Sequence, residues 1–218
     1  MPGLPFANRI AAGQAIAERL LGRANSEALV LGLPRGGVPV AAQIARALGA
    51  SLDVMVVRKL GMPGHEEFAV GAIASGDITV LDEPLIRQLR LDEDALQSVI
   101  DNERRELARR ETTYRGERAA LNLHGRRVIL VDDGIATGAT MRAAIQAVRR
   151  LGAKHCTLAV PVASAETLQA LASEVDDLVC IATPENFYAV GQWYVEFGQT
   201  SDDEVNACLA ELADNADR

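Results

Sequence analysis

The chain has 218 residues, of which 49% are hydrophobic and 24% are charged, and its formal net charge is -8. That length suits one α/β domain with a sizeable core, and the composition excludes a disordered chain. The acidic balance argues against nucleic acid as a partner, because nucleic-acid binders usually carry a basic surplus. No apolar run is long enough to span a bilayer, so no membrane partner is expected. Cys156, Cys180 and Cys208 lack a metal-ligand spacing and no secretory signal precedes them, so a cytoplasmic protein with reduced thiols is predicted.

Hydrophobic periodicity divides the chain into alternating helices and strands. In the first half the predicted elements are a helix over 8–21 with Asn8 as its cap, a strand over 28–33, a helix over 38–48, a strand over 52–57, a loop over 58–67, and a hairpin with strands 68–74 and 78–81 around Ser75-Gly76-Asp77. In the second half they are a long charged helix over 92–118, a strand over 127–131, a helix over 139–151, a strand over 156–162, a helix over 165–171, a strand over 178–182 and a last helix over 202–212.

Buried strands that alternate with helices imply a parallel sheet with right-handed crossovers. The fold class predicted is therefore α/β, with a doubly wound, mostly parallel sheet and one domain over 1–218. The block over 60–120 interrupts this alternation, and it is interpreted as an insertion made of a flexible loop, a hairpin and a long helix.

The segment over 128–140 carries the most informative motif of the chain. Asp132 and Asp133 follow four apolar residues, at the end of a strand where open α/β sheets place their ligands. A turn rich in Gly and Thr then leads directly into a helix, whose N-terminus favours a phosphate. This phosphate site is predicted to consist of Ala136, Thr137, Gly138, Ala139 and Thr140. The carboxylates suit neutral hydroxyls nearby, such as those of a ribose. Asp-Asp-Gly is also an ordinary turn, but the length of the whole motif favours a ligand site.

Two further segments offer cations after predicted strands. Arg35, Gly36 and Gly37 combine a guanidinium with glycines that let the backbone approach a ligand closely, although such a composition is also common in loops. Arg58 and Lys59 stand together at the end of a strand, either as a pyrophosphate clamp or as a solvated strand end, and the glycines after them would permit a lid.

Aromatic residues gather in the segment over 183–200, although they make up only 4% of the chain. Phe187 and Tyr188 are the rings predicted to stack on a flat acceptor, while a hydrophobic cluster that anchors the C-terminus is an equal alternative. Glu185 is a weak candidate for a general base. The chain has no Gly-Lys-Ser/Thr, no Gly-x-Gly-x-x-Gly and no Gly-x-Ser-x-Gly, so the usual P-loop, dinucleotide and nucleophile-elbow chemistries are set aside.

The segment over 128–140 resembles the 5-phosphoribosyl-1-diphosphate (PRPP) motif of the type I phosphoribosyltransferases, and the likeness covers roughly residues 25–200. It is strongest to a bacterial subgroup whose acceptor is not assigned. The resemblance implies transfer of ribose 5-phosphate from PRPP to a nitrogen acceptor, a nucleobase or related ring, with release of pyrophosphate. It also implies Mg²⁺ bound with PRPP and touching Asp132 or Asp133, a homodimer, and a hood over the acceptor formed by 183–200.

The resemblance assigns roles to the remaining candidates. Asp132 and Asp133 would hold the ribose, Arg35, Gly36, Gly37 and Lys59 the pyrophosphate, and Arg58, Lys59 and the two aspartates would be catalytic. The pyrophosphate loop of this family often contains an unusual cis peptide, which the sequence leaves open at or beside Pro34. His65-Glu66-Glu67 departs from the Asn-Pro-Glu of relatives, so His65 has no assigned role. A non-catalytic PRPP- or nucleotide-binding regulatory protein is the alternative, and a structural protein that keeps the fold without a ligand is less favoured.

Overall fold

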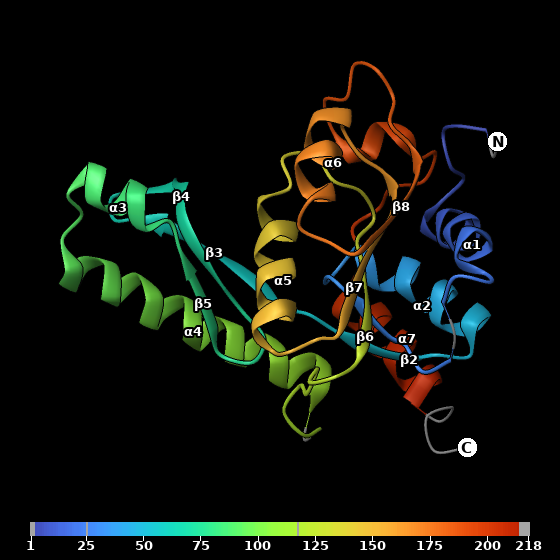
Figure 1. Cartoon of the computed structure of the whole chain (residues 1–218), viewed down its shortest axis with the longest axis horizontal. Helices are drawn as coiled ribbons and strands as arrows, with labels where there is room; N and C mark the ends of the chain where they lie inside the picture. Colours follow the sequence, from blue (N-terminus) through green and yellow to red (C-terminus); the bar gives the residue numbers. More distant parts are fainter. Residues whose placement is uncertain (1–2, 25, 117, 214–218) are drawn as a thin grey trace.

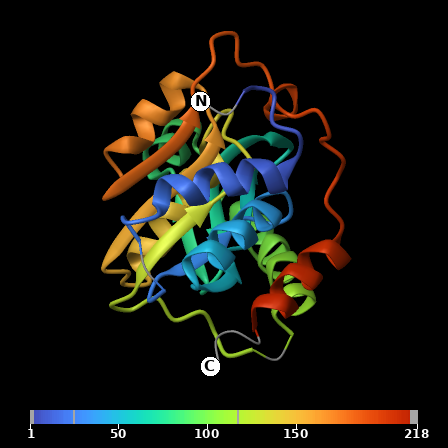
Figure 2. The same ribbon diagram turned by 90° about the vertical axis from the view of Figure 1, so that its right-hand side faces the viewer.

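The computed structural model describes residues 3–24, 26–116 and 118–213. Its main body is a five-stranded parallel sheet in the order β2-β1-β6-β7-β8, built from β1 (Leu29–Gly32), β2 (Ser51–Val54), β6 (Arg127–Val131), β7 (His155–Val162) and β8 (Asp177–Ala182). Helices lie on both faces of this sheet (Figures 1 and 2), so the prediction of a doubly wound α/β fold is confirmed.

Strand β6 explains why both faces are covered. Ile129 and Val131 pack into one core, and Val128 and Leu130 pack into the other, so the whole strand is apolar rather than alternating. The first core is closed by helices on one side of the sheet: α1 (Arg9–Leu20), α2 (Gly37–Leu48) and α7 (Asp202–Ala213). The second is closed by α5 (Ala139–Arg150) and α6 (Ala165–Ala172).

Helix α1 begins where the sequence predicts it. The Asn8 side chain accepts a hydrogen bond of 3.0 Å from the backbone N–H of Ala11, which satisfies one of the free donors at the helix start. Gly49 ends α2 in the left-handed conformation, as its position after the predicted helix indicates. Local chemistry thus fixes the ends of both helices.

An arm projects from this body at one side (Figure 1). It is a three-stranded antiparallel sheet of β3 (Val57–Met62), β4 (His65–Ala74) and β5 (Ile78–Leu81), together with α3 (Glu83–Leu89) and α4 (Glu93–Arg115). One face of the arm sheet is held by α4, because buried Leu60, Val70 and Ile73 belong to the same core as Leu96 and Ile100. The hairpin around 75–77 and the long helix are as predicted.

One local prediction is wrong, and two short elements were not predicted. Residues 58–67 form most of β3 and the start of β4 instead of a loop, because β3 pairs with β4 from Val57↔Ala74 to Met62↔His65. Gly61 permits this pairing, since a Cβ there would lie 2.4 Å from the carbonyl oxygen of Glu66. Helix α3 and the 3-10 turn over Val190–Trp193 were not predicted, because both are too short to give a periodic pattern.

Candidate ligand-binding site

The loop after β6 forms a fixed cradle at the carboxyl edge of the sheet. Ile135 is bound to the neighbouring strand, with its N–H donating to the Val162 carbonyl at 2.9 Å. The hydroxyls of Ser164 and Thr167 donate to the Ala136 carbonyl at 3.3 and 2.7 Å. Gly138 adopts φ +76 just before α5 begins. The loop therefore presents the start of α5 to a hollow of about 200 Å³ lined by Asp132, residues 134–141 and Val190.

This hollow has the chemistry of a phosphate site. Ala136, Thr137 and Ala139 are exposed along it, and the first N–H groups of a helix have no partner within that helix. Those donors and the partial positive charge at the start of α5 both favour an anion. The five residues over 136–140 predicted to hold a phosphate are thus brought together in one place.

The two carboxylates next to the cradle are partly buried. Burial raises the pKa of Asp132 well above its ordinary value, and the neighbouring charge of Asp133 raises it further. Burial also raises the pKa of Asp133, against the opposing effect of the Arg9 guanidinium. Asp132 Oδ1 accepts one hydrogen bond, of 2.8 Å, from the Asp133 backbone N–H. A ligand that brings hydroxyl donors or a cation would relieve the cost of this paired negative charge.

The loop after β1 packs directly against these carboxylates. A Cβ on Gly36 would lie 2.0 Å from Asp133 Oδ2, and a Cβ on Gly37 would lie 2.9 Å from Asp132 Cα. Both glycines are therefore required by close packing between the two loops. The peptide bond between Pro34 and Arg35 is cis. Arg35 lies at the rim, with Nη1 3.7 Å from Asp202 Oδ1.

Arg9 is a site residue that the sequence pattern gave no reason to select. Its Nε lies 2.8 Å from Asp133 Oδ2, and both side chains are mostly buried. Its Nη1 donates to the Gly198 carbonyl at 2.7 Å, and its guanidinium lies 4.0 Å from the centre of the Phe197 ring. Arg9, Arg35, Gly36, Asp133 and residues 197–200 line a hollow of about 330 Å³.

Tyr194 is a second residue that sequence reasoning did not place at the site. Its hydroxyl donates to the Asp133 carbonyl at 2.5 Å. Its ring packs against Phe6 with the ring centres 5.7 Å apart, and burial raises its pKa strongly. Tyr194 thus supports the backbone beneath the carboxylates. The crowding of aromatic residues in this segment was the available signal, but it did not separate the packing rings from the exposed ones.

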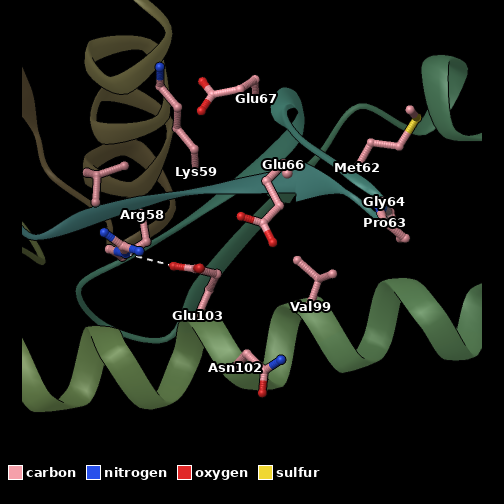
Figure 3. A pocket seen from close by; sticks show the side chains of 12 residues that line it. Arg58, Lys59, Met62, Pro63, Gly64, Glu66, Glu67, Val99, Asn102 and Glu103 are labelled. Carbon is pink, nitrogen blue, oxygen red and sulfur yellow. Dashed lines mark hydrogen bonds and ion pairs between the residues drawn. The ribbon is translucent and has the colours of Figure 1, made fainter.

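Arg58 and Lys59 lie on opposite faces of the arm (Figure 3). The Nε of Arg58 lies 2.7 Å from Glu103 Oε2 on α4, whereas Lys59 points away from that helix. The alternation of side chains along β3 separates them, because consecutive strand residues face opposite sides. Both line a hollow of about 440 Å³ at the arm, and this hollow does not include the two carboxylates or the cradle after β6.

Phe187 and Tyr188 lie beside the cradle after β6. Together with Ala136, Thr137, Ser164, Glu166 and nearby residues they line a hollow of about 530 Å³. Phe187 stacks on Trp193 with ring centres 6.2 Å apart, whereas the Tyr188 side chain is 79% exposed. Glu185 is exposed. Phe187 thus packs within the aromatic segment, as the alternative of a hydrophobic cluster predicts, while Tyr188 is exposed beside the cradle.

Within the described parts of the chain, no group of three or more His, Cys, Asp or Glu side chains is arranged to hold a metal ion. Mg²⁺ in phosphate sites commonly takes one or two carboxylates, together with substrate oxygens and water. Asp132 and Asp133 fit that mode of binding. Among the described helices, none is both long and apolar enough to cross a membrane.

Comparison with known proteins places this arrangement in a family. Residues 4–197 match the model of the phosphoribosyl transferase domain. Two Mycobacterium tuberculosis proteins, "Putative phosphoribosyl transferase Rv0571c" of strain H37Rv and MT0597 of strain CDC 1551, are 47% identical over 94% of this chain. The chain spans about half the length of these curated relatives, since the match covers 46% of theirs.

A solved structure shares nearly the whole fold. TT1426 from Thermus thermophilus superposes with a TM-score of 0.85 and 42% identity, covering 96% of this chain and 99% of its own. The cradle after β6, the two carboxylates and the glycine loop lie within residues 4–197, which the family model matches. The chain therefore belongs to the phosphoribosyl transferase domain family.

Proposed function

We propose that this protein transfers ribose 5-phosphate from PRPP to a nitrogen acceptor, a nucleobase or a related ring, and releases pyrophosphate. The observation that carries the proposal is the partly buried Asp132–Asp133 pair beside the cradle after β6, on the same edge of the sheet. A ribose phosphate matches both parts, because its hydroxyls donate to carboxylates while its phosphate accepts from backbone N–H groups.

The ribose and its phosphate are assigned to residues on either side of Gly134. Asp132 and Asp133 hold the two ribose hydroxyls, and Ala136, Thr137, Gly138, Ala139 and Thr140 hold the 5′-phosphate. The carboxylates also lie where positive charge would develop on the ribose ring as its C1 loses pyrophosphate. Preorganised charges of this kind stabilise a transition state without a covalent intermediate.

The pyrophosphate is assigned to the loop after β1 and to the arm. Arg35, Gly36 and Gly37 border the hollow next to Asp133. Lys59 extends from the arm and would join them if the arm closes over a bound substrate, as catalytic lids do. Arg58 serves with Lys59 as a charge near the leaving group in this scheme, although its guanidinium is engaged by Glu103. The bond from C1 to the pyrophosphate oxygen breaks as the bond from C1 to the acceptor nitrogen forms.

Mg²⁺ completes the proposed substrate. When bound with PRPP it neutralises part of the pyrophosphate charge, and Asp132 and Asp133 are the residues suited to contact it. Phe187 and Tyr188 are proposed to face the acceptor ring, because the exposed Tyr188 side chain lies over the hollow next to the cradle. An anionic acceptor would need no general base, since it has no proton to lose at the reacting nitrogen.

The direct test is Mg²⁺-dependent release of pyrophosphate from PRPP, measured with a panel of nucleobases and related amines and with a control lacking acceptor. Release that requires one acceptor establishes the transferase and identifies its substrate. PRPP binding without release for any acceptor would instead favour a PRPP- or nucleotide-binding regulatory protein. Loss of both binding and release would contradict the proposal.

Lys59→Ala separates catalysis from binding. The chain has only one other lysine, Lys154, which is exposed on the far edge of the sheet and provides a matched control. We expect Lys59→Ala to leave the PRPP dissociation constant nearly unchanged and to slow pyrophosphate release by at least about tenfold, as for removal of one charge that acts on a leaving group. Lys154→Ala should behave as the wild type. Unchanged release in Lys59→Ala would remove the arm from the mechanism.

A further inference from the structure

The N-terminal helix reaches the candidate site through a single side chain. Arg9 is the first residue of α1, and its Nε contacts Asp133 Oδ2 at 2.8 Å across 124 positions of sequence. The ion pair is largely shielded from water, since the exposed fractions of the two side chains are 13% and 14%. Shielding makes the attraction stronger than in a surface pair, and it also makes an unpaired charge costly.

The position of the Arg9 guanidinium is fixed on three sides. Besides Asp133, it donates to the Gly198 carbonyl at 2.7 Å and stacks over Phe197 at 4.0 Å. Within the described parts of the chain, the Nη2 atom of Arg9 makes no hydrogen bond. Arg9 and Arg35 line the same hollow. A planar, preorganised guanidinium held in this way can fix the direction of a carboxylate.

Arg9 differs from the other charged residues near Asp133 because it contacts the carboxylate directly. Asp132 adds a second negative charge from the same loop, and Arg35 lines the same hollow but is drawn toward Asp202 at 3.7 Å. Tyr194 bonds the Asp133 carbonyl rather than its carboxylate. Among the described residues, Arg9 is the cation for which a direct contact with the carboxylate pair is recorded.

We propose that Arg9 is a positioning residue, which holds the Asp133 carboxylate in the direction that binds the ribose and partly offsets the charge of the aspartate pair. This inference rests on the proposed function, since it assigns Arg9 a role in PRPP binding. It predicts that Arg9 acts through Asp133 and has little effect on PRPP once that carboxylate is absent.

The chain supplies the means to anchor such a residue. The segment before α1 is bound to the C-terminal segment by hydrogen bonds of Phe6 N–H to Trp193 O at 2.8 Å and of Val195 N–H to Phe6 O at 2.8 Å. Ile16 and Leu20 bury the other end of α1 in the core. Arg9 therefore extends from a rigid support, which a positioning role requires.

A double-mutant cycle tests the inference. The dissociation constant of isotope-labelled PRPP with Mg²⁺ is measured by equilibrium dialysis, which reaches weak affinities, for the wild type, Arg9→Gln, Asp133→Asn and the double variant. Arg9→Gln is expected to weaken binding at least about tenfold in the wild-type background and by a much smaller factor in Asp133→Asn. Arg19→Gln, on an exposed face of the same helix, is the matched control and should bind as the wild type.

Failure of the proposed function and failure of the Arg9 role give different results. No binding of PRPP by the wild type refutes the proposed function and this inference with it. Suppose that the wild type binds PRPP and that Arg9→Gln changes the affinity equally with and without Asp133→Asn, or not at all. This result overturns the role of Arg9 and leaves the proposed function in place. Arg9→Lys keeps the charge but not the fork, so an affinity between those of wild type and Arg9→Gln supports positioning. If thermal unfolding shows that Arg9→Gln does not fold, Arg9→Lys replaces it in the double-mutant cycle.

Discussion

Gly36 tests the contact between the two loops, because replacing it by alanine changes almost nothing else. Its backbone lies at φ -62 and ψ -31, an ordinary helical conformation that alanine adopts without strain. The new Cβ would lie 2.0 Å from Asp133 Oδ2, while ordinary contacts begin at 3.4 Å. The carboxylate, which pairs with Arg9, must therefore shift by about 1.4 Å to restore an ordinary contact with the new Cβ.

The expected functional loss follows from that displacement. Active sites hold reacting groups within about 0.5 Å of the productive position, and a misplacement of about 1 Å can cost about 100-fold in rate. We therefore expect Gly36→Ala to reduce pyrophosphate release by about 100-fold and to weaken PRPP binding. The free energy of unfolding should fall as well, because restriction of the unfolded chain by alanine, about 0.4–1 kcal/mol, offsets only part of the cost of disturbing a shielded ion pair.

The assay compares Gly36→Ala with two other glycine substitutions. Gly3→Ala is the control, since a Cβ there would meet no atom within 4 Å. Gly37→Ala should lose stability as well as function, because its Cβ would lie 2.7 Å from the backbone oxygen of Val131, which cannot move aside. Wild-type PRPP affinity and turnover in Gly36→Ala would refute the assignment of Asp133 to the ribose.

The same site leads to two further predictions. Burial raises the folded-state pKa of Asp132 above its ordinary value of 3.8. The protonated Asp132 therefore contributes to the free energy of unfolding below pH 3.8, and this contribution is lost as the pH rises through the raised pKa. Asp132→Asn should therefore raise the melting temperature of the ligand-free protein at neutral pH, and it should weaken PRPP binding sharply. Equal melting temperatures of the wild type and Asp132→Asn at neutral pH would contradict the cost of burying this carboxylate. Tyr188→Ala should leave unfolding by denaturant unchanged, because the side chain is 79% exposed. It should raise the KM of the acceptor about threefold to tenfold without changing that of PRPP, as for loss of one stacked ring, and an unchanged acceptor KM would remove Tyr188 from the acceptor site.

Much of the body of the fold was predictable because its elements are encoded locally. The apolar run over 127–131 gives β6 with the same bounds, and Asn8 and Gly49 mark helix ends. The arm was less predictable. The segment after Val57 contains glycines and charges that are typical of a loop, but pairing with β4 makes it a strand. That pairing depends on residues elsewhere in the chain, which no local pattern contains.

The candidate site likewise contains residues that a local pattern identifies and contacts that depend on the whole fold. The carboxylates at the end of β6, the Gly- and Thr-rich turn over 136–140 and the glycine loop can be located from the sequence alone, because each is a contiguous run of residues. The contact of Arg9 with Asp133, the packing of Gly36 against the same carboxylate and the opposite directions of Arg58 and Lys59 (Figure 3) are visible in the folded chain alone. These contacts arise where the crossovers of a parallel sheet bring distant loops to one edge. Their partners are therefore set by packing across the fold rather than by spacing along the chain.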